Sequence, residues 1–241
     1  MLARHGFIGP TRPYEGKFGL FQSHLQAQLP HADLTQLSAG LGTDWKLAET
    51  AIKPYPVCHF AHGAADAAIA LHAEGLDVDA IRSIRILLPA PTLPIVAEPV
   101  AAKARPQTEY AAKFSAPFIV ATCLRLGHFG LAELRPEAMA DERTLTLCDR
   151  TTCATDPETG YPDYFSGGVE LELQDGRQLR HHVRVNSGAG ERQLDRTGAL
   201  RKYGLAAGMH LAPDRAQAAA EAVLAIDRHP VRETMRRLGS N

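Results

Sequence analysis

The densest group of reactive side chains in the 241-residue sequence lies between Lys53 and His62, in the run KPYPVCHFAH. Pro54 and Pro56 each fix their own backbone φ angle and bias the preceding residue away from the α conformation. The run, called the arm below, is therefore predicted to be stiff and extended. It would present an ammonium group at Lys53 and a thiol at Cys58 to a ligand.

The segment that follows the arm determines the surroundings of Cys58, His59 and His62. Residues 61–74 are rich in alanine and end at Gly75, which predicts a helix that begins close to these three side chains. Unpaired backbone N–H groups at a helix N-terminus favour a carboxylate ligand and lower the pKa of a thiol. The position therefore suits an anionic substrate.

Two interpretations of the arm remain open on residue types alone. In a catalytic site, Asp66 would orient the imidazole of His62 from one helical turn away. In a structural role, Cys58 is a small buried hydrophobe, His62 a core histidine with satisfied polar atoms, and Lys53 a solvated residue. A metal site formed by Cys58, His59 and His62 is favoured less than either, because adjacent residues rarely bind one ion and no further ligand pair is visible.

The pattern of apolar residues along the chain predicts which elements support the arm. Apolar spacing and glycine or proline boundaries predict helices over residues 18–25, 61–74, 110–126, 214–226 and 230–238. Alternating side chains predict strands over residues 81–88, 144–148, 169–173 and 178–185. The Asp175-Gly176 pair between the last two is typical of a hairpin turn. The order is helical, then mixed, then helical, which indicates an α+β protein with a small antiparallel sheet.

The remaining polar and glycine-rich motifs are predicted to be structural. His181 and His182 lie in an expected strand, where neighbouring side chains face opposite sides, so an exposed strand is the favoured interpretation. Residues 187–190, with the sequence SGAG, lack the strand–turn–helix context of a phosphate-binding loop. They are predicted to form a turn.

Composition limits the class of partner. Lys and Arg number 26 and Asp and Glu 27, so the net charge of −1 gives no overall attraction to nucleic acid or to anionic lipid. Four prolines interrupt the apolar residues 84–100, which therefore do not form a membrane helix. The four cysteines contain no CxxC pair, which argues against a structural zinc site and favours a reduced, cytoplasmic setting.

The arm resembles that of the MmgE/PrpD family, which includes 2-methylcitrate dehydratases, cis-aconitate decarboxylases and iminodisuccinate epimerases. The similarity rests on Lys53-Pro54-Tyr55-Pro56, on Cys58 and His62, and on the run AADAA at 64–68. Further matching segments are Leu2-Ala3-Arg4 to Gly9-Pro10, Glu15-Gly16 with Gly19, Lys113-Phe114-Ser115 with Pro117, and Asp175-Gly176-Arg177.

The resemblance implies an all-helical domain and a smaller α+β lid domain, with the active site between them. On this basis residues 1–49 are expected to be a remnant of the helical domain and residues 50–190 the lid domain. Residues 191–241 would be C-terminal helices that return to the helical domain. The implied chemistry is dehydration, decarboxylation or epimerisation of a small di- or tricarboxylate, without a metal or an organic cofactor.

The resemblance also implies roles for individual residues. Lys53 would neutralise a substrate carboxylate or the developing enolate, and either Cys58 or His62 would exchange the proton next to that carboxylate. Tyr55 and His59 would bind the substrate. On the same resemblance, Met1 is expected to match a point inside the helical domain, so the family's aspartate-rich motif and its additional histidine are expected to have no counterpart in these residues.

A second departure from the family is the turn after the last expected strand, which reads VNSGAGE over residues 185–191 in place of a proline-rich sequence.

Two forms of the protein are expected from the resemblance. One is a homodimeric enzyme, and the other is a non-catalytic fragment or split-gene subunit that needs a helical N-terminal partner chain. In the second case apolar faces would be left unpaired, and Phe7, Phe18, Phe21 and Leu25 are the residues expected to form them.

Overall fold

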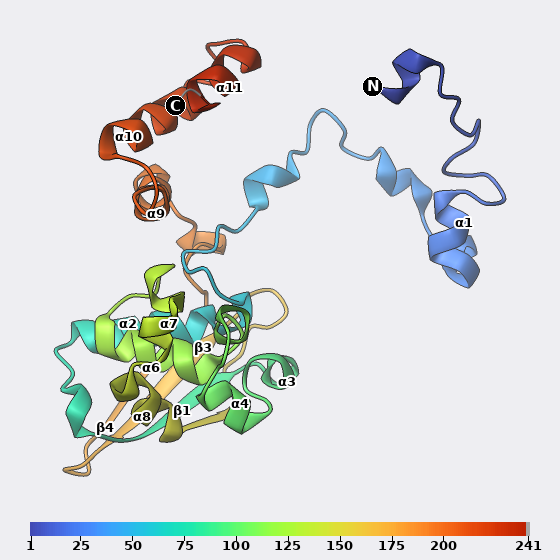
Figure 1. Cartoon of the computed structure of the whole chain (residues 1–241). Helices are drawn as coiled ribbons and strands as arrows, with labels where there is room; N and C mark the ends of the chain where they lie inside the picture. Colours follow the sequence, from blue (N-terminus) through green and yellow to red (C-terminus); the bar gives the residue numbers. More distant parts are fainter. Residues whose placement is uncertain (240–241) are drawn as a thin grey trace. The chain divides into compact units, whose positions relative to one another are not determined.

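The computed structural model describes residues 1–239, which divide into an N-terminal unit, Met1–Glu49, and a second unit that begins at Thr50 (Figure 1). The N-terminal unit contains helix α1, Leu20–Leu25, and four 3-10 turns at Leu2–His5, Gln26–His31, Leu34–Leu37 and Lys46–Glu49. The helix predicted over 18–25 is therefore confirmed from Leu20 onward.

The N-terminal unit has no hydrophobic core of its own, because none of its helices buries a residue. Of the four residues expected on an unpaired face, Phe7 and Phe18 are exposed, the latter to 91%, whereas Phe21 and Leu25 are half-buried. Its origin as a remnant of a helical domain stays a prediction.

A four-stranded sheet with the order β2-β1-β3-β4 organises the second unit. Strands β1, Ile81–Leu88, β3, Gly167–Leu173, and β4, Gln178–Val183, are antiparallel, and the predicted hairpin turn joins the last two. Strand β2, Thr151–Thr155, runs parallel to β1, so the expectation of an antiparallel sheet is wrong for this strand. The long, mostly helical connection between β1 and β2 is the kind of crossover that parallel pairing requires.

The segment predicted as a strand over residues 144–148 is part of helix α8, Glu142–Asp149. The Asp141 carboxylate caps this helix by accepting hydrogen bonds from the backbone N–H groups of Arg143 and Thr144. The buried residues of α8 recur at the helical spacing of three or four positions. The five residues 144–148 are too few to distinguish this spacing from the alternation of a strand.

Two helices with small side chains form the core beside the sheet. Helix α2, His62–Ala73, packs against β3, β4 and helix α6, Ala116–Leu126 (Figure 1). Gly63 allows the close approach, since a Cβ atom there would lie 2.5 Å from the backbone nitrogen of Gly167. The first turn of α2, which follows the arm, is thereby fixed against the start of β3.

The connection from β1 to β2 is built from short helices. These are α3, Leu93–Val96, α4, Val100–Ala104, α5, Glu109–Ala112, and α7, Pro136–Met139. The helix predicted over 110–126 is divided between α5 and α6. The division falls at Ser115, whose side chain accepts a hydrogen bond from the N–H group of Phe118 and starts α6, with Pro117 in its first turn.

Three helices end the described chain: α9, Arg196–Ala207, α10, Pro213–Leu224, and α11, Val231–Gly239. The predictions for 214–226 and 230–238 are confirmed within two residues, whereas α9 was not predicted. Its start carries a signal, since the Asp195 carboxylate caps the backbone N–H group of Gly198. Within residues 1–239, no helix has both the length and the apolar character needed to span a membrane.

Candidate functional site

Two of the expected site residues meet at one backbone oxygen. The Lys53 ammonium group donates a hydrogen bond to the carbonyl oxygen of Val57 at 3.1 Å, and Nε2 of His62 lies 3.4 Å from the same oxygen. Because a carbonyl oxygen only accepts hydrogen bonds, Nε2 carries the ring proton of His62. Lys53 itself remains exposed. The arm thus folds so that an exposed ammonium group lies close to a buried imidazole.

His62 is fully buried and packs against other aromatic rings. Its ring centroid lies 5.3 Å from that of Tyr55 and 4.7 Å from that of His59. Burial, with smaller contributions from the charges of His59 and Lys53, lowers the pKa of His62 to about 3, so the ring is neutral at pH 7. Nδ1 of His62 is buried without a hydrogen-bond partner. The burial matches the structural interpretation of this residue, whereas the unpartnered Nδ1 does not match a histidine whose polar atoms are all satisfied. Its role in proton exchange stays a prediction.

Asp66 does not orient His62, and the expectation of that pair is wrong. The carboxylate is only 6% exposed and accepts hydrogen bonds from Tyr55 Oη at 2.6 Å, the backbone nitrogen of Ser187 at 2.6 Å and Arg192 Nη1 at 3.1 Å. Burial and the Asp66 charge raise the pKa of Tyr55 far above its ordinary value. The Tyr55 hydroxyl is therefore committed to Asp66. We call Asp66, Tyr55, Ser187 and Arg192 the Asp66 cluster.

The loop after β4 contributes more than the turn predicted from its sequence. Arg192 holds this loop together by donating hydrogen bonds to the carbonyl oxygen of Val185 at 2.7 Å and to Ser187 Oγ at 2.8 Å. Gly188 has a φ angle of +86°, and a Cβ atom there would lie 1.9 Å from the carbonyl oxygen of Ile52. The backbone nitrogen of Ile52 in turn donates a hydrogen bond to the Gly188 carbonyl oxygen at 2.9 Å. The SGAG sequence thus permits the loop to lie directly against the start of the arm.

The same loop holds His59 through Asn186, a fully buried residue that sequence reasoning missed. Asn186 Nδ2 lies 2.8 Å from Nε2 of His59 and 3.2 Å from the carbonyl oxygen of Ser187, and Oδ1 lies 3.3 Å from the backbone nitrogen of Phe165. The Phe165 ring packs on that of His59 with centroids 4.7 Å apart. Burial and the Lys53 charge lower the pKa of His59.

Cys58 lies near a second lysine that had no distinguishing signal in the sequence. The thiol residue is half-buried, and its backbone nitrogen donates to the carbonyl oxygen of Lys113 at 2.8 Å. Lys103, on α4, donates hydrogen bonds to the carbonyl oxygens of Ile95 at 2.6 Å and Phe114 at 2.8 Å. Burial lowers the pKa of Lys103, and the charge of a Cys58 thiolate opposes that shift. The thiol is therefore within electrostatic range of this ammonium group.

A second buried carboxylate lies where the sheet strands end, and it corrects the expectation for His182. Nε2 of His182 lies 3.0 Å and 3.1 Å from the two carboxylate oxygens of Asp156, so this side chain faces inward. Asp156 also accepts hydrogen bonds from Ser166 Oγ at 2.6 Å and the backbone nitrogen of Glu158 at 2.9 Å. Burial acts to raise the pKa of Asp156, but the hydrogen bonds from Ser166 and His182 outweigh it and lower this pKa. We call these four residues the Asp156 cluster.

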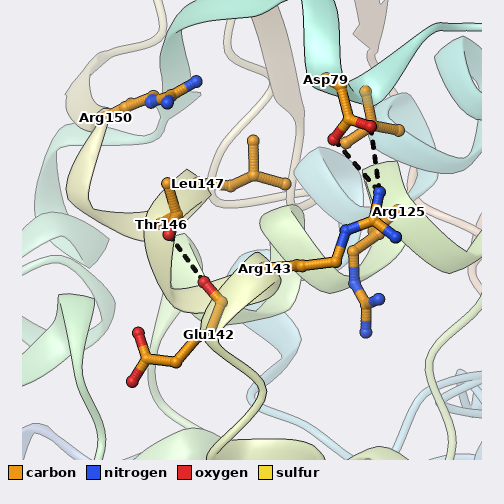
Figure 2. Close-up of a pocket in the computed structure, with 8 residues that line it drawn as sticks. Asp79, Arg125, Glu142, Arg143, Thr146, Leu147 and Arg150 are labelled. Atoms are coloured by element: carbon orange, nitrogen blue, oxygen red, sulfur yellow. Dashed lines mark hydrogen bonds and ion pairs between the residues drawn. The ribbon is translucent and has the colours of Figure 1, made fainter.

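A cavity of about 270 Å³ lies beside α8, away from the arm (Figure 2). Its lining residues are Val78, Asp79, Arg125, Glu142, Arg143, Thr146, Leu147 and Arg150. The charged groups in it already have partners: Arg143 contacts both carboxylate oxygens of Asp79 at 3.1 Å, and Arg150 donates to the carbonyl oxygen of Ile81 at 2.8 Å. None of the expected site residues lines this cavity.

Comparison with protein families agrees with this fold and with the resemblance of the arm. The family described as the MmgE/PrpD C-terminal domain matches residues 55–228 of the chain. The chain belongs to the MmgE/PrpD family, and both the resemblance and the α+β class predicted from the sequence are confirmed.

Among curated proteins, the chain is similar to the cis-aconitate decarboxylase-like protein oryM of Aspergillus oryzae. The two are 24% identical over 196 residues, which make up 78% of this chain and 41% of the relative. The chain thus spans about two fifths of the length of the relative that it matches.

Proposed function

We propose that the protein acts on a small di- or tricarboxylate, as a lyase or isomerase that removes or delivers a proton next to a carboxylate. Membership of the MmgE/PrpD family and the similarity to a cis-aconitate decarboxylase-like protein support this class of reaction. The observation that carries the proposal is the exposed Lys53 ammonium group, held at the carbonyl oxygen of Val57 beside a half-buried thiol and two histidines of lowered pKa.

In this mechanism Lys53 binds a substrate carboxylate. Removal of the proton from the adjacent carbon places negative charge on the oxygens of that carboxylate, and a nearby ammonium group stabilises this charge. Cys58 is the proposed proton acceptor, since it lies on the arm with part of its surface exposed and a cysteine can accept a proton from carbon and return it. His62 is the other candidate from the sequence, and it would have to move to reach a substrate, because it has no exposed surface.

Exchange of substrate hydrogen with solvent tests the proposal directly. The full chain is incubated in deuterium oxide with citrate-like and aspartate-like substrates, and deuterium at the carbon next to the carboxylate is measured by mass spectrometry. We expect uptake that Lys53→Ala reduces by at least about 100-fold, because it removes the charge that stabilises the intermediate. Lys46→Ala, which removes an exposed lysine of the N-terminal unit, is the matched control. Uptake that persists in Lys53→Ala would contradict the role of the arm.

The N-terminal unit favours a second arrangement, in which the chain works as a homodimer or with a helical N-terminal partner chain. Its helices bury no residue, and the matched relative is more than twice as long as the matched region. The test adds the separately produced N-terminal half of a related enzyme to the chain. Turnover only after this addition would indicate a subunit, whereas turnover by the chain alone would indicate a complete site.

The proposal also includes a cytoplasmic location and a reaction without a metal or an organic cofactor. Free thiols at all four cysteines support a reducing compartment. Turnover that survives exhaustive chelation is the expected result for cofactor independence, and loss of turnover that zinc or magnesium restores would contradict it.

A further inference from the structure

The hydrogen bonds of Asn186 determine the orientation of its side-chain amide. Oδ1 receives the backbone N–H group of Phe165 at 3.3 Å, and Nδ2 lies 3.2 Å from the carbonyl oxygen of Ser187. A backbone N–H group only donates and a carbonyl oxygen only accepts, so the two contacts independently assign the same orientation to the amide. The side chain is fully buried, which keeps water from replacing these partners.

This orientation settles which nitrogen of His59 carries the proton. Nδ2 of Asn186 directs its other hydrogen at Nε2 of His59, 2.8 Å away. An amide nitrogen does not accept hydrogen bonds, so Nε2 must be unprotonated and the hydrogen of the neutral ring lies on Nδ1. Burial and the Lys53 charge, which both disfavour the imidazolium form, agree with a neutral ring.

The ring is also fixed in place. It packs against the ring of His62 on one side and that of Phe165 on another, with centroids 4.7 Å away in each case. Within residues 1–239, Nδ1 of His59 makes no hydrogen bond, and the residue is only half-buried. The N–H group at Nδ1 is therefore the polar group of this ring that is left for a ligand, on the same arm as Lys53.

We propose that Asn186 is a positioning residue that holds His59 as its Nδ1–H tautomer, and that His59 donates a hydrogen bond from Nδ1 to the substrate carboxylate bound by Lys53. The substrate contact rests on the proposed function. The carboxylate gains negative charge as the adjacent carbon loses its proton, and a neutral N–H donor fixed beforehand stabilises this charge. The ring keeps its proton throughout, so no further proton acceptor is needed.

The tautomer is measured without any substrate, by ¹⁵N NMR of the histidine rings in the full chain. The chain holds two internal references, because His72 Nδ1 lies 2.8 Å from the carbonyl oxygen of Leu124 and so carries its proton there, whereas His62 carries it on Nε2. His59→Gln identifies the signals of His59 by their disappearance. We expect the Nδ1–H pattern for His59 at pH 7, and an Nε2–H pattern would overturn the proposal.

Asn186→Asp separates positioning from simple structural support. The new carboxylate still accepts the Phe165 N–H group but cannot donate to His59, so Nε2 becomes protonated and the pKa of His59 rises. The spectra are therefore recorded above that raised pKa, where the neutral ring carries its hydrogen on Nε2 and Nδ1 no longer donates. Asn186→Ala, which removes both contacts, should leave a mixture of tautomers. If the His59 signals of the Asn186→Asp variant keep the Nδ1–H pattern, the positioning role is wrong.

Exchange kinetics then test the substrate contact. At a pH where the His59 ring of the variant is neutral, we expect Asn186→Asp to lower kcat by at least about 10-fold, with KM changed less than about threefold, because the lost Nδ1–H donor acts on charge that develops during the reaction. Unchanged kcat in a variant whose tautomer has switched overturns the contact. No exchange by the wild-type chain, alone or complemented, with the Nδ1–H pattern present, overturns the proposed function and the contact with it, while confirming the positioning of His59.

Discussion

Asp66 and Asp156 are two buried carboxylates that are held by the same kinds of donor and differ in their cationic partner. Each accepts one hydroxyl hydrogen bond, from Tyr55 or Ser166, and one backbone N–H group. The Asp66 cluster adds a guanidinium group, from Arg192, whereas the Asp156 cluster adds an imidazole. Arginine keeps its charge at any pH that a folded protein meets, and histidine can lose its own.

The two clusters, which differ in the partner of the carboxylate, hold different segments around the candidate site. The Asp66 cluster joins the arm, α2 and the loop after β4 through a carboxylate whose partner, Arg192, keeps its positive charge. The Asp156 cluster holds Ser166, which directly precedes β3. The neighbouring residue, Phe165, packs on His59. The surroundings of the arm should respond to pH through His59 and His62, whose pKa values are lowered.

The largest expected effect is loss of stability in acid through His62. Its pKa is lowered to about 3 in the folded chain from an ordinary value of 6.5, so the unfolded chain binds this proton first. The contribution is fully present above pH 6.5 and is lost as the pH falls toward 3, amounting to roughly 5 kcal/mol. Urea unfolding at several pH values should show a shallower pH dependence for His62→Gln than for wild type.

His128→Gln, which changes an exposed histidine, is the control for this measurement. It should leave the pH dependence of the free energy of unfolding unchanged. Equal slopes for the wild type and His62→Gln would show that another group is responsible for acid sensitivity near the arm.

Removing one carboxylate charge at a time tests the comparison itself. We expect Asp66→Asn to lower the free energy of unfolding by about 2–3 kcal/mol, because Arg192 stays charged without its partner. The guanidinium is 41% exposed, which places the loss below that of a fully buried pair. Asp156→Asn should cost less, about 1 kcal/mol, because its partner is an imidazole rather than a guanidinium group.

Asp175→Asn removes an exposed carboxylate beside Arg177 and should change the free energy of unfolding far less than either of these variants. Urea unfolding at pH 7 measures all three variants. Equal losses for Asp66→Asn and Asp156→Asn would break the distinction between the two clusters.

The two clusters also show what the sequence could and could not predict. Helix α2, strand β1 and the hairpin were predictable, because alanine-rich spacing, alternation and an Asp-Gly pair act within a few residues. The arm was predicted to be extended, but residues 54–57 bend and bring the Lys53 ammonium group to the carbonyl oxygen of Val57. By contrast, Ser187 and Arg192 lie more than 120 positions from Asp66, and Asn186 lies as far from His59, so no local pattern relates them. The inward side of β4 was equally hidden, because either His181 or His182 could face Asp156.

The close approach of the loop to the arm is tested by two glycines of similar backbone conformation. Gly188 and Gly176 have φ angles of +86° and +85°, so alanine at either position costs about 1 kcal/mol in backbone strain. Only at Gly188 would the new Cβ atom also meet the Ile52 carbonyl oxygen, whereas nothing lies within 4 Å at Gly176. We expect Gly188→Ala to be at least about 1 kcal/mol less stable than Gly176→Ala, and equal stabilities would show that the loop moves aside freely.

The smallest expected effect is the acid response of the Asp156 cluster. Hydrogen bonds from Ser166 and His182 hold the pKa of Asp156 below its ordinary value of 3.8, so the unfolded chain binds this proton first as the pH falls. The contribution is therefore fully present above pH 3.8 and is lost as the pH falls through the lowered pKa of the folded chain. Because this window lies below that of His62, the effect is seen best in a His62→Gln background. There, Asp156→Asn should flatten the pH dependence that remains below pH 3.8. An undiminished slope in that double variant would mean that Asp156 does not hold its charge through the hydrogen bonds of this cluster, and the parallel with Asp66 would then rest on geometry alone.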